Sequence, residues 1–254
     1  MGIGTKTGII ALAGNAFSNI YSLDFDGTDD YINCGTNSNL NFERTDAFSY
    51  SFWVKRNSVG TNHMMLSNMN PSGNRRGMFF NLNSTNNIVV MLRTDTSFDS
   101  QRLLWKSTST ILANSTWRHI VFTYDGSSSI NGGKIYIDGA ADTLHSDSGG
   151  GLSATIIPSS TTPFLIATLS TAPLLPADAL MDEVAVFTTE LSASDVANIY
   201  TGGGTGKPGD LSSFNPLSWW RFEEGSGTTA TDSGTGGNNG TLTDGPTYQT
   251  DVPS

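Results

Sequence analysis

The side chains that could do chemistry in this chain are mainly carboxylates, and several are neighbours in the sequence. Adjacent acidic residues occur at Asp29–Asp30, Asp182–Glu183 and Glu223–Glu224. Cleavage of a glycosidic bond needs two carboxyl groups on either side of the sugar, roughly 5–10 Å apart. Because neighbouring residues of a strand point to opposite faces of the sheet, we expect that none of these pairs supplies both groups by itself.

Other catalytic motifs are missing from the sequence. The three histidines, His63, His119 and His145, are far apart, and there is no Gly-x-Ser-x-Gly elbow, HExxH motif or phosphate-binding loop. Covalent catalysis needs a nucleophile within hydrogen-bond reach of a base, and no local motif provides one. The sequence therefore predicts a protein that is not an enzyme and has no catalytic residues.

Two aromatic residues are candidates for ligand binding. Trp105 and Tyr124 could offer ring faces to a sugar, because an aromatic ring combines an apolar surface with a polar tip. The Asn- and Ser-rich segments 60–76 and 94–101 could add hydrogen-bonding groups around such rings. The same composition is also typical of solvent-exposed turns, so both readings of these segments remain open.

Composition excludes several classes of protein. The 254 residues suit one large domain, and charged residues are 14% of the chain, below the usual ~25%. The net charge of −10 argues against nucleic acid as a partner, since phosphate binding needs basic patches. Cys34 is the single cysteine, so an intrachain disulfide cannot form. No apolar stretch approaches the ~18 residues of a membrane span, so we expect no membrane insertion.

Short alternating segments predict strands, and one segment predicts a helix. In residues 48–55, Phe48, Tyr50, Phe52 and Val54 fall on one face of an expected strand. Residues 191–200 are the exception, because Ser192 and Asp195 have the spacing of a capping box at the start of a helix. Together these patterns favour a β-sandwich with one short helix.

Several segments, taken together, resemble the laminin-G-like (concanavalin A-like) jelly-roll family, which includes pentraxin-like domains. They are YSLDFDGTDDYINCG (21–35), WRHIVFTYDG (117–126), KIYIDG (134–139), MDEVAVF (181–187) and WWRFEEGSGTTATDSGTGGNNGTLTDGP (219–246). The resemblance implies an all-β fold, a two-sheet antiparallel jelly-roll sandwich with one short helix near 191–200.

The order of these segments is unusual, because the block at 219–246 resembles the family's first strand and here comes last. The fold is thus apparently circularly permuted, although a strand handed to a neighbour or a truncated second repeat would give the same order. We expect a division into an N-terminal extension (1–20), a jelly roll (21–201), a Gly/Pro-rich connector (202–216) and a C-terminal segment completing the jelly roll (217–254). Phe222 and at least one of Trp219 and Trp220 should then be buried.

The resemblance also implies a structural Ca²⁺ site. In similar jelly rolls, a loop of the kind found at 231–240 and the Asp of the strand at 181–187 often lie together at a metal ion. On that basis Asp182, Asp232 and Asn238 would be ligands, and oxygen donors of these types suit Ca²⁺. The alternative is an Asx-turn without an ion.

The function implied is that of a non-enzymatic virion structural protein of the kind found in bacteriophages: a capsid decoration, fibre or tail component. It would be located on the virion, adhere to host-surface glycans, and have other virion proteins and further copies of itself as partners. The apolar run at 8–14 is too short for a signal peptide. The alternatives are a carbohydrate-binding module of a secreted glycan-degrading system, and a decoration protein without a glycan ligand.

Overall fold

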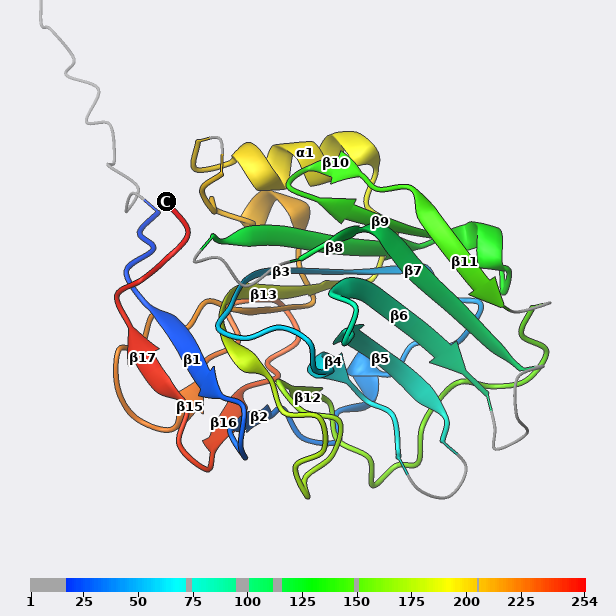
Figure 1. Ribbon diagram of the computed structural model, residues 1–254, viewed down its shortest axis with the longest axis horizontal. Helices are drawn as coiled ribbons and strands as arrows, with labels where there is room; N and C mark the ends of the chain where they lie inside the picture. The colour runs from blue at the N-terminus through cyan, green and yellow to red at the C-terminus, as the bar shows by residue number, and fades with distance from the viewer. Residues whose placement is uncertain (1–16, 72–74, 95–100, 112–115, 149–150, 205) are drawn as a thin grey trace, which may run out of the picture.

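The computed structural model describes residues 17–71, 75–94, 101–111, 116–148, 151–204 and 206–254. Most of the predicted extension at 1–20, and parts of the Asn- and Ser-rich segments 60–76 and 94–101, lie outside these residues. The described chain forms two antiparallel sheets packed face to face (Figure 1). The predicted two-sheet jelly-roll sandwich is confirmed.

One sheet has eight strands in the order β10-β9-β8-β3-β13-β1-β17, with β14 also paired to β13. The bounds are β1 Ser22–Asp26, β3 Phe48–Arg56, β8 Arg118–Tyr124, β9 Gly133–Ile137, β10 Ala140–Ala141, β13 Asp178–Phe187, β14 Ser218–Trp220 and β17 Thr247–Gln249.

The other sheet has nine strands in the order β11-β7-β6-β5-β4-β12-β2-β16-β15. The bounds are β2 Tyr31–Asn33, β4 His63–Ser67, β5 Gly77–Leu82, β6 Asn87–Arg93, β7 Arg102–Thr110, β11 Leu144–Ser148, β12 Leu165–Ile166, β15 Thr229–Ala230 and β16 Gly240–Thr243. Three short 3₁₀ helices complete the connections: η1 Ser38–Leu40, η2 Ile130–Gly132 and η3 Ser212–Phe214.

The core between the sheets follows from the alternation of apolar residues. Phe48, Tyr50, Phe52 and Val54 of β3 all belong to the central cluster, as the sequence predicts. Trp53 points to the other side, where its ring stacks on Tyr200 with centroids 5.7 Å apart. Because both faces of this strand are covered, the middle of the eight-stranded sheet is buried on both sides.

The C-terminal segment pairs with both sheets of its own chain. Trp220 of β14 lies opposite Val184 of β13, β16 pairs with β2 and β17 pairs with β1. In Figure 1 the red C-terminal strands accordingly lie beside the blue N-terminal ones. Trp220 and Phe222 have no exposed surface and Trp219 is 4% exposed. The block that comes last in the sequence is thus an integral part of the sandwich.

The single α-helix in the described part of the chain, α1 (Ala193–Thr201), covers the outer face of the eight-stranded sheet. Ser192 accepts a hydrogen bond from the backbone N–H of Asp195, whose carboxylate accepts one from the backbone N–H of Ser192. Val196 and Ile199 pack against Val121 of β8 and Phe187 of β13. The short helix predicted at 191–200 is confirmed, and it is the capping box that fixes where it begins.

A β-bulge in β13 changes where two acidic residues point. The pairing with β3 shifts register between Asp182 and Ala185, and Glu183 has a positive φ of 51°. The extra residue of a bulge breaks the strict alternation of a strand. Asp182 and Glu183 therefore both leave the core side, which is occupied by Met181 and Val184. The expectation that such neighbours point to opposite faces is wrong at this position.

Candidate functional site

The two aromatic residues predicted to bind a ligand lie in the core instead. Trp105 and Tyr124 have no exposed surface, and their rings pack together with centroids 5.7 Å apart. Trp105 Nε1 donates to the carbonyl of Ile130 at 2.7 Å, and the Tyr124 hydroxyl donates to the carbonyl of Arg44 at 2.7 Å. Neither ring can stack on a sugar in this structure. An alternating strand leaves open which of its faces is inside, and here the ring-bearing face is inside.

Two of the three residues predicted to bind Ca²⁺ share a loop, but the carboxylate there already serves the backbone. Asp232 accepts hydrogen bonds from the backbone N–H groups of Trp219 (2.8 Å), Gly234 (2.8 Å) and Asn238 (2.7 Å). Asn238 donates through Nδ2 to the Ser218 hydroxyl at 2.8 Å. The loop thus has the character of the alternative, an Asx-type turn, and it fastens β14 to the strand that follows.

Asp182, the third predicted ligand, is not brought to this loop. Trp220 pairs with Val184 on one side and forms a bridge with Asp232 on the other, so Asp232 is two strand spacings from β13, about 10 Å. The Asp182 side chain also lies on the outer face of the sheet. Ligands of one Ca²⁺ ion must each reach within about 2.6 Å of it. The three residues do not fit a shared ion.

Asp182 is instead part of a buried acidic pair. It has no exposed surface, its Oδ2 accepts from Asn19 Nδ2 at 2.9 Å, and its Oδ1 has no hydrogen-bond partner among the described residues. Burial and the neighbouring Glu183 raise the pKa of Asp182 well above its usual range. Burial also raises the pKa of Glu183 to about 8, against the opposing effect of Arg221.

A strap formed by residues 17–20 seals this pair from solvent. The Arg221 guanidinium donates to the carbonyl of Ser18, and its central carbon lies 4.4 Å from the centroid of the Phe17 ring. Phe17 stacks in turn on Trp219, whose Nε1 donates to Glu183. Groups with strongly shifted pKa values can mark an active site, but here the chain itself fills the space that a substrate would need.

A serine–histidine pair on the same face is equally enclosed. Ser51 Oγ and His119 Nε2 share a hydrogen bond of 2.9 Å, and His119 stacks on Trp53 and Tyr200. His119 has no exposed surface, and burial lowers its pKa to about 3. A neutral imidazole in contact with a hydroxyl has the geometry of a nucleophile and its base. It lies beneath α1, however, without access for a substrate.

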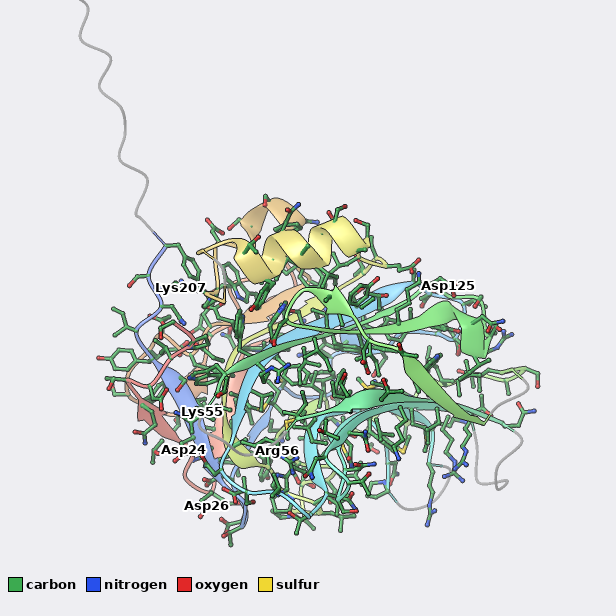
Figure 2. All side chains as sticks on the ribbon, turned by 45° about the horizontal axis from the view of Figure 1, so that its top comes forward. Asp24, Asp26, Lys55, Arg56, Asp125 and Lys207 are labelled. Carbon is green, nitrogen blue, oxygen red and sulfur yellow. The ribbon has the colours of Figure 1, made fainter. Side chains whose placement is uncertain are left out.

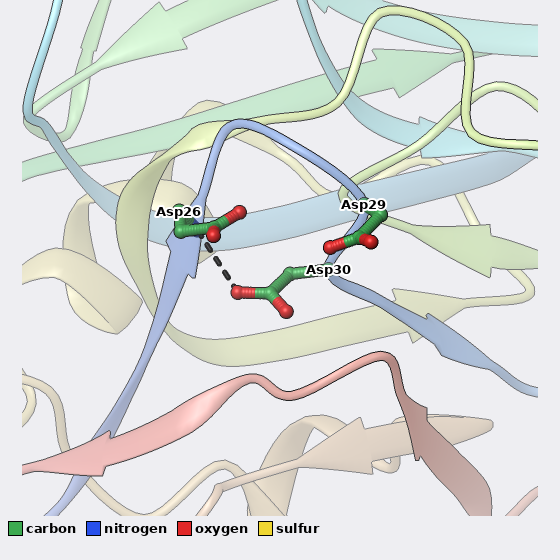
Figure 3. A group of neighbouring side chains, drawn as sticks. All are labelled: Asp26, Asp29 and Asp30. Carbon is green, nitrogen blue, oxygen red and sulfur yellow. Dashed lines mark hydrogen bonds between the residues drawn. The ribbon is translucent and has the colours of Figure 1, made fainter.

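Three carboxylates come together at the end of β1 and in the loop that leads to β2 (Figure 3). Oxygen atoms of Asp26, Asp29 and Asp30 lie within 4.8 Å of one another. Asp30 is the buried member; its carboxylate accepts from the backbone N–H of Asp26 at 3.0 Å, and burial raises its pKa. The chain turns tightly at Gly27, which has a positive φ of 78°, and this turn brings the three side chains together.

On the outer face of the nine-stranded sheet, the strands β5, β6 and β7 present a surface of apolar and basic side chains. Register aligns Phe79 of β5 with Met91 of β6 and Met91 with Leu104 of β7. The next row pairs Arg93 with Arg102 on one side of these apolar residues, and Lys106 opposes Val89 on the other. Phe79, Leu104, Arg93, Arg102 and Lys106 are half-buried, whereas Met91 and Val89 between them are 7% and 9% exposed.

The sequence analysis did not predict this surface, although the residues of β5, β6 and β7 alternate between the core and the outer face. Each of β5, β6 and β7 sends every second side chain into the core, namely Met78 and Phe80, Val90 and Leu92, and Leu103 and Trp105. The remaining side chains form the outer face, with Arg93, Arg102 and Lys106 among them. A signal was available in the concentration of basic residues between 75 and 106, but pairing three strands in register requires the structure.

Solved structures with a similar fold come from diverse organisms. A protein from Bacteroides ovatus described as carbohydrate-binding superimposes with a TM-score of 0.65 at 18% identity, covering 93% of this chain and 62% of the other. A heptameric SAP-like pentraxin from Limulus polyphemus gives a TM-score of 0.56 at 12% identity, covering 91% and 95%. This chain thus spans less than two thirds of the first protein, and at such identities the likeness shows the fold.

A search of curated protein sequences finds no match. The family described as the concanavalin A-like lectin/glucanases superfamily (Laminin_G_3) matches residues 26–197. This range runs from the last residue of β1 through β13 into α1 but does not include the C-terminal strands, in keeping with their displaced position in the sequence. Since it covers more than half of the chain, the protein belongs to the concanavalin A-like lectin/glucanase superfamily.

Proposed function

We propose that this protein is a non-catalytic carbohydrate-binding domain that binds sugar on the outer face of the nine-stranded sheet. The observation that carries the proposal is the row of Phe79, Met91 and Leu104 across β5, β6 and β7, with polar and charged side chains on both sides of it. Sugar rings have apolar C–H faces and polar rims. A binding surface with an apolar centre and a few placed polar groups matches that chemistry.

The distribution of titratable groups supports a role without catalysis. Three groups of types that often act as acids or bases, Asp182, Glu183 and His119, have strongly shifted pKa values, and all three are buried on the outer face of the eight-stranded sheet. A general acid or base must come within hydrogen-bond reach of its substrate. These groups are covered by the strap and α1, so their shifted pKa values reflect burial inside the fold.

The location proposed for this binding activity is a virion, with the domain serving as a capsid decoration, fibre or tail component that adheres to host-surface glycans. Its partners would be other virion proteins and further copies of the chain. The support is the resemblance of the sequence motifs to modules of bacteriophage virion proteins. Mass spectrometry of purified particles tests this location, and recovery of the chain only in a soluble fraction with glycan-degrading enzymes would favour the carbohydrate-binding module instead.

Glycan binding is tested on an array of neutral and acidic oligosaccharides with the full chain. Replacing both Phe79 and Leu104 by Ala should weaken binding by about tenfold or more, a loss of about 1.4 kcal/mol. The matched control is Ile20→Ala, since Ile20 is 50% exposed and lies on the strap over the other sheet. Failure to bind any glycan would reject the proposal in favour of a decoration protein without a glycan ligand.

No helix in the described residues is long and apolar enough to cross a membrane.

A further inference from the structure

Positive charge in this acidic protein is concentrated in one part of the chain. Residues 75–110 contain five Arg or Lys and two Asp, a net charge of +3, whereas the rest of the chain contains eight basic and 21 acidic residues, a net charge of −13. This segment forms β5, β6 and β7, which lie side by side in the nine-stranded sheet (Figure 1). This segment therefore has a net positive charge, whereas the rest of the chain has a large net negative charge.

Three of the five basic side chains lie on the outer face of that sheet. Arg93 and Arg102 occupy directly opposed positions on β6 and β7, and Lys106 lies four residues further along β7. Four residues of a strand span about 13 Å. The positive groups thus stand at both ends of a strip whose centre is the apolar row of Met91 and Leu104.

The opposed arginines have a physical cost that a negatively charged ligand would reduce. Like charges directly opposite on neighbouring strands destabilise a sheet. Both side chains have interactions within the chain. A guanidinium group has five N–H donors, however, so it can keep an internal partner and still donate to a ligand. Planar guanidinium groups are also well suited to paired hydrogen bonds with carboxylate and similar oxyanions.

Two more arginines lie beside this strip, at the start of β5. Arg76 Nε donates to the carbonyl of Thr94 at 3.0 Å, which holds its side chain beside the end of β6. Arg75 is exposed and precedes it. By contrast, Asp24 and Asp26 lie together near the end of β1, as Figure 2 shows, in a strand of the other sheet. A polyanion approaching the protein would be drawn to β5–β7 and repelled from the acidic regions.

We propose that the glycan bound on this face is anionic, a polysaccharide carrying uronate or sulfate groups. Arg93 and Arg102 would bind an acidic group at one end of the strip and Lys106 a second one at the other end. The sugar rings between these groups would pack on the half-buried Leu104, beside Met91, which is 7% exposed. This inference rests on the proposed carbohydrate-binding function and names the class of ligand.

The test measures the affinity of the full chain for four probes: heparin, alginate, neutral dextran and a DNA duplex. Binding should be strongest to heparin or alginate and should weaken as salt rises from 50 to 200 mM, because exposed charges are screened. The double variant Arg93→Gln/Arg102→Gln should lose about tenfold or more of that affinity. Lys134→Gln removes one charge from the eight-stranded sheet and should bind like the native protein. Thermal unfolding checks that each variant is folded.

The outcomes separate the two proposals. Binding to neutral dextran or other neutral glycans alone would overturn the anionic ligand while leaving carbohydrate binding in place. Binding to no glycan would overturn both. Equal affinity for the DNA duplex, or equal losses in the arginine and Lys134 variants, would show general attraction of polyanions and would also overturn the proposal.

Discussion

The face of the eight-stranded sheet that is turned away from the core is covered by α1, by residues 211–214 of the connector and by the strap at 17–20. On the nine-stranded sheet, the corresponding face of β5–β7 presents half-buried apolar and basic side chains. On the covered face of the eight-stranded sheet, the titratable groups with shifted pKa values are buried. On the face of β5–β7, the charged side chains are partly exposed to solvent. Asp182, Glu183 and His119, whose pKa values are strongly shifted by burial, therefore lie on the closed side of this sandwich, and the surface proposed for binding lies on the other side.

The closed side depends on segments far apart in the sequence. Trp219 comes from the C-terminal block, Phe17 from the N-terminal strap and Glu183 from the bulge of β13, and the three meet through ring stacking and one hydrogen bond. Each would expose the others if it were removed. The open side depends only on β5, β6 and β7, which are close in sequence. Substitutions should consequently affect stability on the closed side and binding on the open side.

The largest effect is expected from deleting residues 217–254. This removes β14, β15, β16 and β17, exposes the edges of β1, β2 and β13, and leaves the space of the buried Trp220 and Phe222 side chains empty. Unpaired edges promote aggregation, so the truncated chain should be insoluble or aggregate in size-exclusion chromatography. A soluble truncated chain with a cooperative unfolding transition would contradict the role assigned to this segment.

A single substitution on each face gives a sharper comparison. Trp219→Ala should lower the free energy of unfolding by about 3–5 kcal/mol, as expected for loss of a large buried ring, and it also removes the hydrogen bond to Glu183. Phe79→Ala on the open face should cost about 1 kcal/mol, because that ring is only half-buried. Urea denaturation measures both. Equal costs would show that the two faces are not built differently.

The loop that fastens β14 provides the next test. Asp232→Ala removes three acceptor contacts to backbone N–H groups and should lower the free energy of unfolding by about 2–3 kcal/mol, at roughly 1 kcal/mol for each bond. Because the carboxylate itself supplies these contacts, EDTA should leave the melting temperature of the native protein unchanged. A lower melting temperature in EDTA that Asp232→Ala abolishes would instead show that the loop holds a metal ion.

The parts of this structure that could be predicted are those governed by local pattern. Alternation in β3 identified its core face, the spacing of Ser192 and Asp195 located the helix, and the misplaced block indicated that Phe222 would be buried. Fold class therefore followed from short segments. These features depend only on residues that are close together in the sequence.

The candidate site could not be predicted, because it depends on which way strands face and how they pair. Trp105 alternates with Leu104 in β7, and nothing in that alternation says which residue faces the core. The bulge at Glu183 reverses the expected separation of two neighbouring carboxylates, and bulges have no reliable sequence signal. The opposed arginines meet only through the register of β6 with β7. The order of these residues along the chain can be read from the sequence, but the sequence does not say which residues lie side by side on neighbouring strands.

The last of the expected effects concerns pH and the buried His119 on the closed side. Its pKa in the folded protein is lowered to about 3 from the ordinary 6.5, so the unfolded chain takes up this proton first as the pH falls. The corresponding stability is fully present above pH 6.5 and is lost progressively from pH 6.5 toward pH 3. At pH 5 the loss should be about 2 kcal/mol, at 1.36 kcal/mol for each pKa unit.

The measurement is the free energy of unfolding at pH 7 and pH 5 for the native protein and for His119→Gln, which keeps a polar group near Ser51 but has no charge. Other groups titrate in the same range: burial lowers the pKa of His63, whereas the raised pKa of Glu183 has the opposite effect on stability. They are present in both proteins, so the difference between the two pH dependences isolates His119. The variant should lose about 2 kcal/mol less than the native protein between pH 7 and pH 5. Identical losses would mean that this imidazole can be protonated in place, and hence that the closed face admits water and protons much as the open face does.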